Sequence, residues 1–124
     1  PDIFADPEQM KRVINNIISN SVKYMDKPKG KIDIRLLDEV DSVRIEIEDN
    51  GKGIAAKDLP LIFERFYRTD ASRNSSQGGS GIGLSIVKKI IEDHGGYIWA
   101  TSKEGEGTCL HFVIRKYREA EADE

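Results

Sequence analysis

The chain has 124 residues, the usual size of one compact domain, and we expect a single domain over residues 1–124. Its net charge is −3, with Lys and Arg scattered among Asp and Glu, which argues against a nucleic-acid partner because such partners require a clustered basic face. No apolar run approaches the roughly 20 residues that span a bilayer, and one cysteine cannot form an internal disulfide. We therefore expect a segment without membrane contact. Because the chain opens without Met, we interpret it as a fragment.

The first half of the chain predicts a helix followed by a hairpin. Asp6 can cap the helix, Pro7 suits its first position, and Gln9 stands where a capping box places its second member. The helix should bury one stripe: Met10, Val13, Ile14, Ile17, Ile18, Ser21 and Met25. Pro28 and Gly30 should end it. Apolar residues then alternate over 32–36 and 43–47, which predicts two half-buried strands joined by a short acidic turn.

The second half predicts a short helix over 59–66, a long helix from about Gly83 to Gly95, and strands over 97–102 and 108–115. Residues 69–81 are polar and small, which predicts a mobile loop, and we interpret residues 69–80 as a lid with a glycine-rich exit. Residues 117–124 should form an acidic tail. Blocks of helices and strands predict an α+β fold, a two-layer sandwich with helices on one face of a mixed, mostly antiparallel sheet.

Three groups of residues have side chains or backbone groups that could bind a ligand. Asn16, Asn20 and Lys23 follow one edge of the first helix, where amide oxygens suit a hard cation and a lysine suits phosphate; the alternative is a solvated helix face. The strand alternation carries the Asp49 carboxylate toward the core side, where a ligand amine or the backbone of an Asn-Gly turn could satisfy it. Finally, a glycine-rich run opens the second long helix and could approach an anion, or be a flexible linker.

The order of these motifs carries a resemblance. The chain contains Asn16-x3-Asn20-x2-Lys23-Tyr24, Asp49-x-Gly51-x-Gly53, Ile62-Phe63-Glu64-Arg65-Phe66-Tyr67-Arg68, Gly79-x-Gly81-x-Gly83 and Gly105-x-Gly107-Thr108. This set resembles the N, G1, F, G2 and terminal Gly-Thr boxes of bacterial sensor histidine kinases, in the gyrase/Hsp90/histidine-kinase/MutL superfamily with its Bergerat fold. The resemblance extends from Asp6 to about Ile114.

The resemblance implies ATP and Mg²⁺ as ligands. Asp49 matches the aspartate that accepts the adenine amino group, Thr108 the hydroxyl that orients it, and Asn20 the Mg²⁺ ligand. Asn16 stands where related ATPases carry a Glu, and an amide cannot take a proton from water. The implied catalytic residues are Asn16, Lys23, Arg65 and Arg68. The implied nucleotide-binding set further contains Tyr24, Gly51, Gly53, Ile54, Phe63, Gly79, Ser80, Gly81, Ile82, Gly83 and Leu84.

The chain departs from the full kinase pattern because it lacks a box with a phosphoacceptor histidine. We interpret His94 and His111 as structural or surface residues. The resemblance therefore implies a separate dimerisation and histidine-phosphotransfer domain as partner, and a response regulator that the parent protein serves. It further implies a cytoplasmic domain of a membrane-anchored parent. The strand expected before the first helix is represented only by Ile3 and Phe4.

Three alternatives remain at this point. An anti-sigma-factor serine kinase carries Glu at the position of Asn16 and differs around Phe63. A nucleotide-binding module without transfer activity would act as a docking or sensing surface. A hydrolysing ATPase clamp of the gyrase type would need the missing Glu and a transducer domain.

Overall fold

The computed structural model describes residues 6–64 and 82–116. Its elements are α1 (Pro7–Lys23), β1 (Ile32–Asp38), β2 (Ser42–Asp49), a 3₁₀ turn η1 (Leu59–Leu61), α3 (Ile82–Asp93), β3 (Tyr97–Lys103) and β4 (Gly107–Arg115). The predicted acidic tail, the first strand, the lid, and the site residues Arg65, Arg68, Gly79, Ser80 and Gly81 lie outside the described residues.

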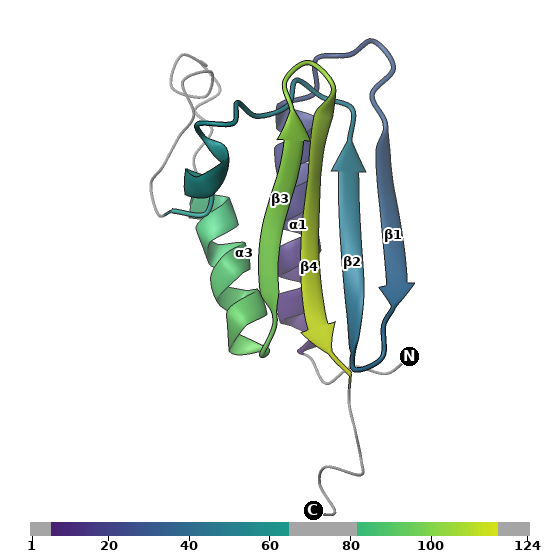
Figure 1. Cartoon of the computed structure of the whole chain (residues 1–124), viewed down its shortest axis with the longest axis vertical. Coiled ribbons are helices and arrows are strands. Elements are labelled where there is room, and N and C mark those ends of the chain that lie inside the picture. The colour runs from purple at the N-terminus through teal and green to yellow at the C-terminus, as the bar shows by residue number, and fades with distance from the viewer. Residues whose placement is uncertain (1–5, 65–81, 117–124) are drawn as a thin grey trace, which may run out of the picture.

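The described strands form one sheet in the order β1-β2-β4-β3, and all three pairings are antiparallel. Both α-helices lie behind this sheet in the view of Figure 1, so the molecule has two layers. The predicted α+β sandwich is confirmed. The central pair, β2 and β4, joins strands that are far apart in sequence, because η1, α3 and β3 intervene.

The core lies between the helices and the inner face of the sheet, the face that carries Val43, Ile45 and Ile47 of β2. Its buried members are Val13, Ile17, Val43, Ile45, Ile47, Val87, Ile90, Ile91, Leu110, Phe112 and Ile114. The helices pack over β2, β3 and β4. The edge strand β1 alternates as predicted, but Ile34 and Leu36 remain exposed because neither helix reaches over them.

The start of α1 differs from the predicted capping box. Asp6 caps the helix by accepting a hydrogen bond from the Glu8 amide at 2.9 Å. The amide of Asp6 does not bond to Gln9, whose Oε1 has no hydrogen-bond partner in the described part of the chain. That amide donates instead to Nε2 of His94 at 3.2 Å, while Nδ1 of His94 donates to the Ile90 carbonyl at 2.8 Å. His94 is therefore structural, as predicted, and ties the start of α1 to the end of α3.

Two other boundaries differ from the sequence interpretation. Helix α1 ends at Lys23, with Tyr24 as its cap, several residues before Pro28. The predicted helix over 59–66 is a single 3₁₀ turn, Leu59–Leu61, in its described part, with Pro60 in its first turn. Among the described residues, no helix is both long and apolar enough to cross a membrane.

Candidate functional site

Several chain segments end together at one end of the two layers. In Figure 1, the end of α1, the end of β2, the β3–β4 turn and the beginning of α3 all lie toward the same, upper end of the molecule. Helix N-termini carry a partial positive charge and unpaired N–H groups, and helix edges can present side chains to a ligand. The predicted site residues of these segments are therefore brought to one region.

Asp49 ends β2 with its side chain on the inner face of the sheet. It continues the alternation of Val43, Ile45 and Ile47, which are buried, and is itself half-buried. Its Oδ1 accepts a hydrogen bond from the Gly51 amide at 2.9 Å. A carboxylate has about four acceptor positions, so Oδ2 can still accept from a ligand. The Asn-Gly turn alternative is confirmed in part: the Gly51 backbone does bond to Asp49, but the turn does not lead into a paired strand, because the chain continues to η1.

The glycines around Asp49 let backbone segments approach it closely. A Cβ at Gly51 would stand 2.8 Å from the Tyr24 carbonyl oxygen and 3.0 Å from Asp49 Oδ1. Gly53 and Gly107 have φ of 76° and 131°, a region that disfavours other residues. A Cβ at Gly107 would clash with the Asp49 carbonyl. The close packing of the Asp49 loop against α1 and β4 thus depends on these glycines.

Ser102 joins three segments of the site through its hydroxyl group. Its Oγ accepts from the Ile54 amide at 2.8 Å and donates to the Gly107 carbonyl at 2.7 Å. It also lies 2.9 Å from Oγ1 of Thr108. A serine has one hydroxyl proton, and the Gly107 carbonyl takes it, so Thr108 is the donor in the third bond. The Thr108 oxygen is then left as an acceptor.

The α1 residues line the edge of the same region. Asn16 and Asn20 are half-buried and Lys23 is exposed on the last turn. The amide nitrogen of Asn20 donates to the Asn16 carbonyl at 3.0 Å, which leaves the side-chain oxygen as the atom that can coordinate a cation. The Tyr24 carbonyl accepts from the Lys52 amide at 3.2 Å, and Nζ of Lys52 lies 5.7 Å from the Tyr24 ring centre. The end of α1 is therefore fixed to the loop that follows Asp49.

The remaining predicted site residues in the described part of the chain lie either at the start of α3 or, for Phe63, against the core. Ile82 and Gly83 are the first residues of α3, whose N-terminus is suited to an anion, and Leu84 is half-buried on its first turn. Phe63 is partly buried and packs against the core, so its role in the structure is packing.

These atoms fit a purine nucleotide with a divalent cation. The partly buried Asp49 carboxylate, an acceptor, suits an exocyclic amine, which is a donor. The Asn20 oxygen is a hard ligand of the kind that Mg²⁺ prefers, and Lys23 supplies positive charge on the same helix. Together, the fold and this donor set define an ATP-binding α+β sandwich domain.

The comparison with known families agrees. Residues 5–118 match the family described as histidine kinase-, DNA gyrase B-, and HSP90-like ATPases. The chain belongs to this family. Over 122 residues it is 40% identical to the sensor histidine kinase WalK of Bacillus subtilis (strain 168), an alignment that covers 96% of the chain and 20% of WalK. It is also 40% identical over 119 residues to the adaptive-response sensory kinase SasA of Synechococcus elongatus, which covers 95% of the chain and 30% of SasA.

Solved structures give the same result. The mycobacterial sensor histidine kinase MprB superposes with a TM-score of 0.80 at 30% identity, over 91% of this chain and 76% of that one. The catalytic domain of histidine kinase ThkA superposes with a TM-score of 0.76 at 35% identity, over 92% and 70%. The chain is thus a catalytic ATP-binding domain of the sensor histidine kinase type, and it spans less than a third of the curated relatives' length.

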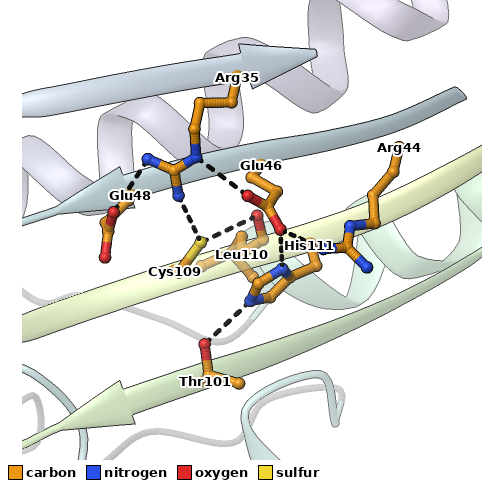
Figure 2. Close-up of polar contacts among 8 residues, drawn as sticks. All are labelled: Arg35, Arg44, Glu46, Glu48, Thr101, Cys109, Leu110 and His111. Atoms are coloured by element: carbon orange, nitrogen blue, oxygen red, sulfur yellow. Dashed lines mark hydrogen bonds and ion pairs between the residues drawn. The ribbon is translucent and has the colours of Figure 1, made fainter. Parts of the chain in front are cut away.

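Sequence reasoning missed two groups of polar residues. One is Ser102, whose only signal was its position two residues before the β3–β4 turn. The other is a cluster on the outer face of the sheet, the face away from the helices (Figure 2). It contains Arg35, Arg44, Glu46, Glu48, Thr101, Cys109 and His111. Strand alternation places each of them outward, but their meeting depends on the pairing of β2 with β4.

Charge and burial shift two pKa values in this outer cluster. The hydrogen bond from Arg35 to Glu46, 3.0 Å long, holds the pKa of the Glu46 carboxyl below its usual value, and His111 and Arg44 add to the effect. Burial raises the pKa of the Cys109 thiol to about 11, and the negative charges of Glu46 and Glu48 contribute. Glu46 is therefore ionised and Cys109 protonated at neutral pH.

Proposed function

We propose that this domain binds ATP with Mg²⁺ at the Asp49 end of the sheet and presents the γ-phosphoryl group to a histidine on a separate dimerisation domain. The position of Asp49 carries the proposal: a half-buried carboxylate at a strand end, held by the Gly51 amide and opposite the buried Thr108. Bound ATP supplies the phosphoryl group.

The residues have distinct parts in this proposal. Asp49 accepts a hydrogen bond from the adenine amino group, and Thr108 accepts from a water that bridges to the base. The Asn20 oxygen coordinates Mg²⁺, and Lys23 neutralises phosphate charge. Asn16 is an amide and so cannot act as a general base toward water. Slow hydrolysis would preserve the phosphoryl group for a protein acceptor. By resemblance, Arg65 and Arg68 add positive charge near the terminal phosphate.

The acceptor histidine belongs, in this proposal, to another domain of the parent protein, which then serves a response regulator. Both histidines of the present chain support that view. Each ring nitrogen of His94 is hydrogen-bonded, to the Asp6 amide and the Ile90 carbonyl. The ring nitrogens of His111 are likewise engaged, by Glu46 and Thr101. Neither imidazole offers an unengaged nitrogen for attack on phosphorus.

Phosphotransfer with labelled ATP tests the proposal. The chain is incubated with Mg²⁺ and γ-labelled ATP, alone and with the phosphoacceptor domain of its parent protein. Label should appear only on the added domain, as an acid-labile and base-stable phosphate. Stoichiometric label on the chain alone, or release of inorganic phosphate faster than transfer, would contradict the proposal. Calorimetric titration with ATP, with and without Mg²⁺, separates a failure of binding from a failure of transfer.

A further inference from the structure

A sulfur and an oxygen from two buried residues meet a nitrogen from a half-buried one on the outer face of the sheet. Glu46 of β2 lies directly opposite His111 of β4 in the antiparallel register, and Cys109 precedes His111 by two residues, so all three side chains share that face. Asp49, on the inner face, belongs to the nucleotide site. The two groups are thus separated by the sheet, and the outer cluster has no part in the proposed phosphotransfer.

The distances suit a small metal ion. One potential ligand atom from each of Glu46, Cys109 and His111 lies within 4.8 Å of the other two, and Nδ1 of His111 is 2.9 Å from Oε2 of Glu46. Tetrahedral zinc, with bonds of roughly 2.0–2.3 Å, requires ligand atoms about 3–4 Å apart. The present separations, all within 4.8 Å, are close to that spacing. We propose that Glu46, Cys109 and His111 form a binding site for a divalent transition-metal ion of the Zn²⁺ class.

The choice of metal follows from the ligands. A thiolate, an imidazole and a carboxylate together favour borderline ions such as Zn²⁺ or Co²⁺ over Mg²⁺ and Ca²⁺, which prefer oxygen alone. Three protein ligands leave one position for water. Glu46 and Cys109 are only 7% and 6% exposed, so these ligands are held by the packing of neighbouring strands and are not mobile surface side chains.

A second layer of contacts orients the imidazole. Oγ1 of Thr101 lies 2.9 Å from Nε2 of His111, and the Trp99 ring stacks on the His111 ring at 5.0 Å between centres with 3° between planes. When Nδ1 binds a metal, Nε2 carries the ring proton and donates it to Thr101. Hydrogen bonds of this kind fix the tautomer and orientation of metal-binding histidines.

Two arginines compete with the metal for Glu46. Arg35 donates to Oε1 of Glu46 at 3.0 Å and reaches within 3.8 Å of the Cys109 sulfur, and Arg44 lies 2.9 Å from Oε2. The Arg35 side chain is 42% exposed and also pairs with Glu48 at 3.0 Å. It can therefore turn toward Glu48 when a cation enters. Removal of this competing charge, in Arg35→Gln, should tighten metal binding.

Cobalt titration of the whole chain without nucleotide tests the site. Co²⁺ bound to a thiolate gives a near-ultraviolet charge-transfer band, and it should quench Trp99, the only tryptophan of the chain. We expect one equivalent of Co²⁺ to produce both signals and Zn²⁺ to reverse them. The absence of the band at saturating Co²⁺ would overturn the proposal. The measurement contains no ATP, so its failure is distinguishable from failure of the proposed phosphotransfer.

Variants identify the ligands. Cys109→Ser should abolish the band, and His111→Ala should weaken Co²⁺ binding at least tenfold. Thr101→Val, at an exposed position, should weaken it about tenfold, in line with the usual cost of losing a supporting hydrogen bond. The matched control is His94→Ala, which removes the other histidine and should change affinity less than twofold. Circular dichroism checks folding, and if His111→Ala does not fold, Cys109→Ser and Thr101→Val decide. Unchanged affinity in Thr101→Val together with a retained band in Cys109→Ser would overturn the proposal.

Discussion

Asp49, the last residue of β2, lies directly opposite Thr108, the second residue of β4, and both side chains are on the inner face of the sheet. The pair stands where the core ends and the loops begin. Thr108 is 8% exposed, and its hydroxyl is bonded to Ser102. A half-buried carboxylate beside a buried hydroxyl forms a polar pair at the edge of an apolar layer, which suits recognition of a flat ring with one polar edge.

Replacing Asp49 with Asn should weaken ATP binding by about tenfold to a hundredfold. The amide presents one acceptor oxygen and a donor group, and the donor faces the adenine amino group without a partner. A mismatched buried polar group costs about 1–3 kcal/mol. Calorimetric titration with ATP and Mg²⁺ measures the change. GTP, which carries a carbonyl at that ring position, should bind the unmodified chain at least tenfold more weakly than ATP.

The matched control for this substitution is Asp33→Asn. Asp33 is an exposed residue of β1 opposite Glu48, on the outer face of the sheet. Its replacement should change ATP affinity less than twofold. Equal affinities of the unmodified chain for ATP and GTP would contradict the role of Asp49.

Local sequence pattern was sufficient for the long helices, the strands and one face of the site, but not for the ends of α1 or the length of η1. The predicted buried stripe of α1 is confirmed for Val13, Ile17 and Ser21 but wrong for Ile14, which is 36% exposed. The alternation from Val43 predicted the inward side of Asp49. Both periodicities are fixed by backbone geometry within one element. The ordered motifs then indicated the family, because spacing between them is a property of the sequence alone.

Contacts between elements that are far apart in the sequence could not be predicted from the pattern within each element. The meeting of Glu46 with His111 requires β2 to pair with β4, although 57 residues lie between the two strands (50–106). The Ser102 hydroxyl reaches Ile54 for the same reason. The exposure of Leu36 depends on which strands the helices cover. None of these follows from periodicity, because each is decided by the three-dimensional arrangement of whole elements.

Asn20→Ala should remove most of the Mg²⁺ dependence of ATP binding. The Asn20 oxygen is the α1 atom that can coordinate the cation, because its amide nitrogen is engaged by the Asn16 carbonyl at 3.0 Å. ATP affinity with Mg²⁺ should fall about tenfold, to nearly the value without Mg²⁺. Calorimetric titrations with and without Mg²⁺ measure this difference. Asn15→Ala, an exposed change on the same helix, is the control and should retain the dependence; a Mg²⁺ effect retained in Asn20→Ala would assign the ligand elsewhere.

Ser102→Ala should lower both stability and ATP affinity. The substitution leaves the Ile54 amide, the Gly107 carbonyl and the Thr108 hydroxyl without their common partner. Part-buried polar groups that lose a hydrogen bond cost about 1–3 kcal/mol. Urea denaturation should show that loss in the free energy of unfolding. Ser42→Ala, in a strand at the far end of the sheet, is the control and should cost less than about 0.5 kcal/mol.

Gly107→Ala should destabilise the domain more than Gly105→Ala. Both glycines have positive φ, 131° and 81°, so both substitutions carry backbone strain of about 1 kcal/mol or more. At Gly105 no atom stands within 4 Å of the added Cβ, whereas at Gly107 the Cβ would clash with the backbone of Asp49. Thermal denaturation of the two variants measures the difference. Equal melting temperatures of the two variants would show that β4 can move away from the end of β2 at Asp49 without loss of stability.

Cys109 should react slowly with iodoacetamide at neutral pH, and faster as the pH rises. The thiolate is the reactive form, and burial, with the charges of Glu46 and Glu48, raises the pKa of the thiol from 9.0 to about 11. Two pKa units correspond to about a hundredfold less thiolate at pH 7 than in an ordinary cysteine. The rate should therefore increase about tenfold per pH unit up to pH 10 and show no plateau near 9. Mass spectrometry follows the reaction at a single site, because the chain has one cysteine.

The denatured chain provides the control for this rate. In concentrated urea the thiol leaves the sheet, its pKa returns to the ordinary value, and alkylation at pH 7 should accelerate about a hundredfold. The difference between the folded-state and unfolded-state pKa of Cys109 also makes the free energy of unfolding depend on pH. Because the folded-state pKa lies above the unfolded-state pKa, the native state is favoured below pH 9, and this contribution is lost as the pH rises from 9 toward 11. Cys109→Ala should flatten that part of the stability profile. An alkylation rate that is the same in native and denatured chains would show that Cys109 is accessible and unperturbed, against the buried position that β2 and β4 give it.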